Sequence, residues 1–122
     1  MPAPPLQNLT DDERLTLHVL AWLLLRMGLP ERAGRVYAAL ADAEDAPDRR
    51  ACAGLAAVEL TRPDGDPAVA LRWLNAALAG RAPSSREAGL HLMRAQALWR
   101  ADRTDEARSA LAAWRHNHGA EG

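Results

Sequence analysis

Three segments of the sequence align with one another, without a gap, at a constant interval of 37 residues. They are GLPERAGRVYAAL (28–40), GDPAVALRWLNAA (65–77) and DRTDEARSALAAW (102–114). An alanine stands at the same place in each segment, as Ala33, Ala70 and Ala107. Small and large apolar residues that recur at fixed offsets are typical of chains in which similar units pack one against the next. We therefore expect a repeat architecture, with these three alanines buried where two helices touch.

Start and stop signals around these segments predict six helices. Thr10 and Glu13 form a capping box at the start of the first helix, which Gly28 ends after residue 27. Either Ser84 or Ser85 is expected to cap the fifth helix. The second helix is expected over residues 30–46, because Pro47 ends it. The remaining helices are expected over residues 48–62, 68–80 and 104–116. No segment alternates apolar and polar residues as a strand does, so the predicted class is all-α.

Composition limits the partners that such a chain can have. The 122 residues carry 15 Arg and no Lys against 16 Asp plus Glu, for a net charge of -1. This balance argues against a nucleic-acid partner, which needs a net basic surface. Cys52 is the only cysteine, so an internal disulfide and a zinc site of several thiolates are excluded, and a reducing cytoplasm is the expected location.

We expect the chain to divide into a flexible Pro-rich leader (1–9), a single helical domain (10–118) and a disordered tail (119–122). The longest apolar run, residues 19–25, is far shorter than the roughly twenty residues that span a bilayer. We therefore expect no membrane insertion. The helix that contains this run is apolar on all sides, so another protein surface is expected to cover it.

The repeated pattern resembles that of the tetratricopeptide repeat (TPR). Gly28 stands at the turn, Ala33 follows five residues later, and the bulky Tyr37 comes four residues after that. In the first helices, the corresponding large and small positions hold Leu17, Leu20 and Ala21, then Gly54, Ala57 and Val58, then His91, Arg94 and Ala95. The first unit fits the family well and the second poorly. The resemblance implies three stacked TPR-like helix hairpins that form a short right-handed superhelix with a concave groove.

The first unit has a narrower resemblance. The stretch AWLLLRMGLPERAGRVYAAL (21–40) is similar to the first repeat of type III secretion chaperones of the SctY/YscY assembly-chaperone type. This similarity implies a chaperone or adaptor that holds an apolar helical or extended segment of a client. The implied client is a small secreted or secretion-apparatus protein, with the export gate as a further candidate partner.

The resemblance also implies which residues line the groove, because the first helix of each TPR pair faces it. The implied partner-binding residues are mostly apolar, and each helix carries an arginine near its end. They are Leu15, His18, Trp22, Leu25 and Arg26 in the first unit, Cys52, Leu55, Glu59 and Arg62 in the second, and Leu92, Gln96, Trp99 and Arg100 in the third.

Several alternatives remain open from the sequence. Trp22 and Trp99 are either groove or core residues, and Cys52 can be a small apolar filler. A homodimer could cover the apolar helix, in which case the protein would be a structural subunit that self-associates or scaffolds an assembly without a dedicated client.

Catalysis finds little support in the sequence. His116 and His118 point to different helix faces, and His18 and His91 lack a carboxylate at a metal-ligand spacing. No HExxH, GxSxG or P-loop pattern occurs. We therefore expect a protein that is not an enzyme and that needs no cofactor or metal.

Overall fold

The computed structural model describes residues 9–42, 48–79 and 88–119, and within these ranges it is all-helical, as predicted. The helices are α1 (Asp11–Arg26), α2 (Pro30–Asp42), α3 (Arg49–Thr61), α4 (Pro67–Leu78), α5 (Gly89–Arg100) and α6 (Thr104–Gly119). Each odd-numbered helix packs against the next even-numbered one, so the helices form three pairs. No helix of the described part is long and apolar enough to cross a bilayer.

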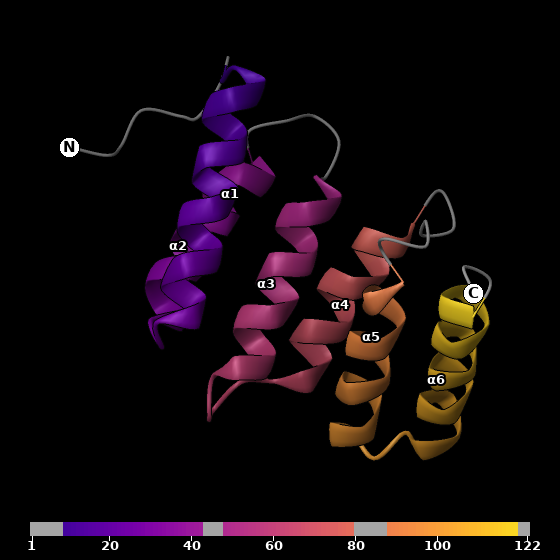
Figure 1. Cartoon of the computed structure of the whole chain (residues 1–122). Helices are drawn as coiled ribbons and strands as arrows, with labels where there is room; N and C mark the ends of the chain where they lie inside the picture. Colours follow the sequence, from indigo (N-terminus) through magenta and orange to yellow (C-terminus); the bar gives the residue numbers. More distant parts are fainter. Residues whose placement is uncertain (1–8, 43–47, 80–87, 120–122) are drawn as a thin grey trace.

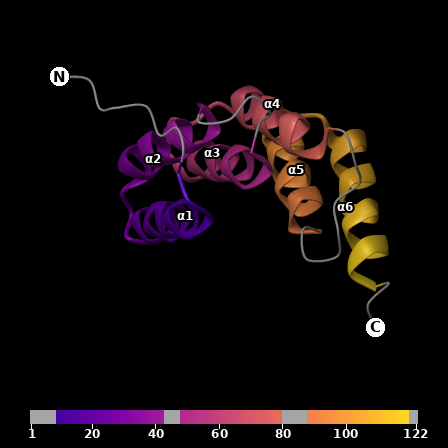
Figure 2. The same ribbon diagram turned by 90° about the horizontal axis from the view of Figure 1, so that it is seen from above.

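The three pairs lie side by side in a row that begins at α1 and ends at α6 (Figure 1). Successive pairs meet where α2 packs against α3 and α4 packs against α5. The first helices also touch, α1 with α3 and α3 with α5. Seen from above, the row is bent, with α1 and α6 at its two ends (Figure 2). The middle pair is thus covered on both sides, whereas α1 and α6 each have a side that no described helix covers.

The capping box predicted at the start of α1 is present, and two further helix starts carry side-chain caps that were not predicted. The Thr10 side chain accepts a hydrogen bond from the Glu13 backbone N–H, and the Glu13 side chain accepts one from the Thr10 N–H, which confirms the capping box. Asp48 caps α3 and Asp66 caps α4, each through its carboxylate. Satisfying the free N–H groups of the first turn stabilises each helix by about 1 kcal/mol.

Four sequence-based predictions fall outside the described residues. They are the flexible leader over 1–8, Pro47 as a helix stop, Ser84 or Ser85 as a cap, and the disordered end over 120–122. The last residue of the predicted leader, Leu9, is half-buried and packs against a cluster of buried apolar residues around Tyr37. Gly119, the first residue of the predicted tail, is the last residue of α6.

Two clusters of buried apolar residues hold the pairs together. One lies among α1, α2 and α3 around Tyr37, and the other lies among α3, α4, α5 and α6 around Leu74. Ala33, Ala70 and Ala107 are 0, 0 and 4% exposed, which confirms their predicted burial. Helix α3 contributes side chains to both clusters and therefore joins the two halves of the molecule.

The first and third turns end their helices in the same way. Gly28 and Asp102, which correspond in the 37-residue pattern, have positive φ angles of 80° and 60°. In each turn the N–H of the following residue donates to the carbonyl oxygen five residues earlier, at 2.9 Å. This is the Schellman arrangement, which satisfies carbonyls left free at a helix end.

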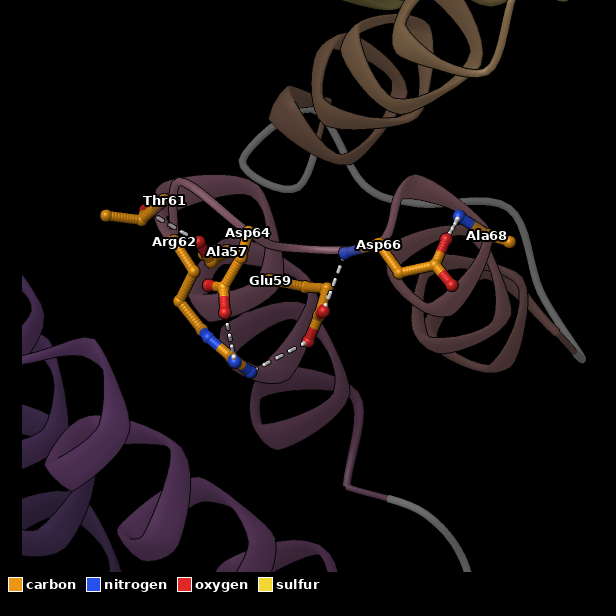
Figure 3. A network of polar contacts seen from close by, with 7 residues as sticks. All are labelled: Ala57, Glu59, Thr61, Arg62, Asp64, Asp66 and Ala68. Carbon is orange, nitrogen blue, oxygen red and sulfur yellow. Dashed lines mark hydrogen bonds and ion pairs between the residues drawn. The ribbon is translucent and has the colours of Figure 1, made fainter.

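The middle turn is longer and has its own polar network (Figure 3). Five residues, 62–66, separate α3 from α4, against three residues in each of the other pairs. The Glu59 carboxylate accepts a hydrogen bond from the Asp66 N–H at 2.8 Å and lies 3.8 Å from the Arg62 guanidinium, which also pairs with Asp64 at 3.5 Å. A Cβ atom at Gly65 would overlap the carbonyl oxygen of Glu59, so this turn closes only around glycine.

The two extra residues of the middle turn change the alignment of α3 with α1 and α5. The small buried residues that correspond become Ala21, Ala56 and Ala95, which are 0, 0 and 9% exposed. The gapless alignment puts Val58 in place of Ala56, which explains why the second unit fits the TPR pattern poorly. The sequence-based register of α3 is therefore wrong by two residues, a rotation of about 200° around the helix axis.

Candidate functional site

Most of the exposed large apolar side chains in the described residues belong to α1. Eight such side chains are exposed, and six of them lie on α1 or on Met27, its C-cap. They are Leu15, Val19, Leu20, Trp22, Leu23 and Met27. The opposite side of α1 packs against α2 and α3. Contiguous exposed apolar surface of this kind marks interaction sites in soluble proteins.

Three of the five predicted groove residues on α1 are exposed. They are Leu15, Trp22 and Arg26, and the Arg26 guanidinium lies 5.8 Å from the centre of the Trp22 ring. Leu25 is half-buried, and His18 is buried. Since Trp22 is 53% exposed, the alternative that it is a core residue is excluded.

His18 takes part in a polar contact that the sequence did not predict. Its Nε2 atom lies 3.1 Å from Oδ2 of Asp48, and the other oxygen of that carboxylate accepts the Arg50 N–H at the start of α3. A guanidinium nitrogen of Arg14 lies 3.7 Å from the same Asp48 oxygen. These groups surround a recess of about 260 Å3 lined by Asp11, Arg14, Leu15, His18, Asp48 and Arg50. His18 therefore joins α1 to α3 and does not line an apolar groove.

The structure corrects the prediction for Cys52 in the second unit. Cys52 is 1% exposed and offers no surface to a partner, whereas Leu55, 9% exposed, lines a recess of about 370 Å3 together with Glu59 and Arg62. The prediction for Cys52 failed because of the two-residue error in the register of α3. Glu59 and Arg62 are half-buried and hold the middle turn. Three of the four predicted residues of the second unit therefore meet at one recess between α2 and α3.

The environment of Cys52 agrees with its interpretation as an apolar filler. The side chain packs in the second core cluster. Burial, and to a smaller extent the charge of Asp48, raises the pKa of the Cys52 thiol. The thiol therefore stays protonated near neutral pH, which makes it a poor nucleophile and a poor metal ligand.

In the third unit, three of the four predicted groove residues meet at one place. Leu92, Gln96 and Trp99 line a shallow pocket of about 270 Å3 between α5 and α6, together with Ala95, Ala107, Arg108 and Leu111. Trp99 is 62% exposed, so it is not a core residue. Arg100 instead donates a hydrogen bond to the carbonyl oxygen of Leu60 at 2.7 Å and ties α5 to the end of α3.

Within the described residues, no group of three or more His, Cys, Asp or Glu side chains is placed to hold a metal ion. Comparison of the chain with protein-family models, with curated proteins and with solved structures found no match. Function is therefore proposed from the surface and the sequence of this chain.

Proposed function

We propose that the protein is a protein-binding chaperone or adaptor. Its helix pairs are TPR-like hairpins stacked in a short right-handed superhelix, and its inner surface holds an apolar helical or extended segment of a client. The observation that carries this proposal is the exposure of Trp22 on a helix with five other exposed large apolar residues on it or at its C-cap. Burying such surface yields about 25 cal/mol for each Å2 removed from water.

The character of the surface supports a protein partner. Trp22 and Arg26 belong to the residue types that dominate the energetics of protein interfaces. The aromatic ring provides apolar contact area, and the adjacent guanidinium can pair with a carboxylate or a backbone carbonyl at the rim. The near-zero net charge fits an apolar segment better than a nucleic acid.

The corrected register of α3 changes which residues lie at the middle of the proposed inner surface. On α3, the residues that correspond to His18 and Trp22 of α1 are Ala53 and Ala57, both half-buried. These small side chains leave space, whereas Trp22 on α1 and Leu92 on α5 are large and exposed. The surface that we propose for the client therefore has large apolar side chains on α1 and α5 and small alanine side chains on α3 between them.

The kind of client follows from the resemblance of residues 21–40 to the assembly chaperones of type III secretion. We propose a small secreted or secretion-apparatus protein that the chain binds in the cytoplasm, with the export gate as a further partner. A client kept partly unfolded before export exposes apolar segments, and these are what an apolar inner surface can cover.

The test compares two tryptophan variants. Proteins retained by the wild type and by Trp22→Ala from an extract of the source cells are identified by mass spectrometry, and the affinity of the purified client is then measured by calorimetry. Removing an aromatic anchor from an interface costs about 2 kcal/mol or more, so Trp22→Ala should weaken binding at least tenfold. Trp114, half-buried on α6, is the matched control: Trp114→Ala should lower the melting temperature and leave the affinity unchanged.

Two results would contradict the proposal. One is a client that binds Trp22→Ala as tightly as the wild type. The other is the absence of any protein retained specifically by the wild type.

A further inference from the structure

The structure repeats one kind of interface between neighbouring pairs. Helix α3 packs against α2, where Gly54 faces the ring of Tyr37 so closely that a Cβ atom on Gly54 would overlap it. One turn further along, the Val58 side chain lies 3.3 Å from the place of a Cβ atom on Gly34. The stripe of α3 that makes this interface is Gly54, Leu55 and Val58, and all three residues are buried.

The corresponding stripe of α1 is apolar but uncovered. With the corrected register, Gly54, Leu55 and Val58 correspond to Val19, Leu20 and Leu23, which are 48, 44 and 45% exposed. We call these three residues the docking stripe of α1. It has the composition of a surface that packs against a preceding helix pair, yet no described helix lies against it.

At the α5–α6 end of the row, apolar residues are more exposed than their counterparts in the first two pairs, which the following pair covers. Leu25 of α1 is half-buried beside α3, and Leu60 of α3 is buried beside α5, whereas the corresponding Trp99 of α5 is exposed. Tyr37 and Leu74 are 6 and 0% exposed, whereas the corresponding Leu111 of α6 is half-buried in the shallow α5–α6 pocket. We call this pocket, with Leu92, Trp99 and Leu111, the receiving crevice.

We propose that the docking stripe of one copy of this chain packs in the receiving crevice of a second copy, head to tail. The two surfaces correspond to the two sides of the interface that already joins α2 to α3 and α4 to α5. Interior repeats of such proteins are joined by nearest-neighbour interfaces, and terminal repeats usually carry a polar outer face. Here the docking stripe of α1 is apolar, and the receiving crevice is lined by apolar side chains apart from Gln96 and Arg108, so a further pair can dock at either end.

The charges at the two ends agree with this pairing. Because α3 runs antiparallel to α2, the docked α1 would run antiparallel to α6 of the other copy (Figure 1). The acidic start of α1, with Asp11 and Asp12, then meets the end of α6 with Arg115. At the other end, Arg26 meets Asp105 in the first turn of α6. Opposite charges thus face each other at both ends, and this favours one orientation of docking.

The symmetry of the proposed contact has a measurable consequence. The two copies use different surfaces, so each dimer keeps one free docking stripe and one free receiving crevice. Association therefore continues beyond the dimer as the concentration rises. An ordinary two-fold dimer would instead stop at two copies.

The experiment uses two variants, each of which damages one surface. Leu20→Glu places a charge in the docking stripe, and Trp99→Glu places one in the receiving crevice; both residues are exposed, so folding should be retained. Light scattering coupled to size-exclusion chromatography gives the mass of each protein over a range of concentrations, and circular dichroism checks the fold. Trp22→Glu, on α1 but outside the docking stripe, is the matched control.

We expect the mass of the wild type and of Trp22→Glu to rise with concentration, and each surface variant to remain monomeric. A mixture of Leu20→Glu with Trp99→Glu should form a one-to-one dimer that does not grow, because one intact stripe meets one intact crevice. A wild type that stays monomeric at every concentration would overturn the proposal. The docking stripe would then be covered by the leader of the same chain or by another protein. A mixture that forms no complex, or a dimer that tolerates both substitutions, would also overturn the proposal.

The inference does not depend on the proposed client. A chain that stays monomeric but loses client affinity in Trp22→Ala would refute the head-to-tail contact and leave the chaperone function standing. Self-association without a client that depends on Trp22 would refute the chaperone function and leave the head-to-tail contact standing.

Discussion

Helices α1 and α3 occupy corresponding places in neighbouring pairs, but they differ in what covers them. Helix α3 packs on both sides and carries small residues, Gly54 and Ala56, where its neighbours come close. Helix α1 packs on one side and carries Val19 and Leu23 at exposed places. The difference shows that apolar residues on a helix do not by themselves mark the core. Here they contribute to stability in the middle of the row and are available for binding at its end.

The largest predicted effect separates the buried middle from the exposed end. Leu74 is 0% exposed in the second core cluster, so Leu74→Ala should lower the free energy of unfolding by about 2–5 kcal/mol. Leu23→Ala, the same chemical change on α1 at a residue 45% exposed, should change it by no more than about 0.5 kcal/mol. Urea denaturation followed by circular dichroism measures both. Equal losses would mean that α1 is covered as fully as α4.

A smaller effect tests the difference between the turns. Gly28→Ala has open space for the new methyl group but must hold alanine at a φ of 80°, which costs about 1 kcal/mol. Gly65→Ala forces the methyl group into the Glu59 carbonyl, so the middle turn must shift, at a cost of about 1–3 kcal/mol. Thermal unfolding of the two variants ranks them. If Gly28→Ala were the less stable variant, the close approach in the middle turn would be refuted.

The smallest effect concerns pH and the third pair. His91 of α5 corresponds to Cys52 of α3, but it is only half-buried. Burial first, and then the charge of Arg94, lowers the pKa of His91 from its usual 6.5. The unfolded chain therefore binds this proton at a higher pH than the folded chain does. The resulting stability is complete above about pH 6.5 and is lost as the pH falls from there through the folded pKa.

The measurement compares the wild type with His91→Gln, which cannot titrate. The loss of melting temperature between about pH 7.5 and 5.5 should be slightly smaller in His91→Gln. The same loss in both proteins would show that His91 does not contribute to the pH dependence.

The sequence predicted most of the helices because their boundaries depend on local chemistry. Thr10, Gly28 and Asp48 act within one turn of their own position, and a cap or a turn can be recognised without knowing the fold. The burial of Ala33, Ala70 and Ala107 was also predicted, because the second helices of the three pairs keep one interval.

The site was harder to predict because it depends on how the helices are rotated. The error at Cys52 arose from the length of a single turn, which the constant interval of the second helices conceals. The contact of His18 with Asp48 joins residues that are 30 apart in the sequence, and no local pattern marks it. The exposure of Trp22 and Trp99 depends on which neighbours a helix has, so only the assembled row could decide it.

The close fit of Tyr37 against Gly54 has a consequence for how such a chain can be rearranged. The corresponding residues at the next interface are Leu74 and Met93, a smaller side chain opposite a larger one. At each interface between helix pairs, the sizes of the two facing side chains are matched to each other. These matched sizes fix the order of the three pairs. Exchanging the second and third units would set the Tyr37 ring against a methionine and would leave Gly54 opposite a leucine, with too little to fill the space. The units are alike in form, but they cannot be permuted.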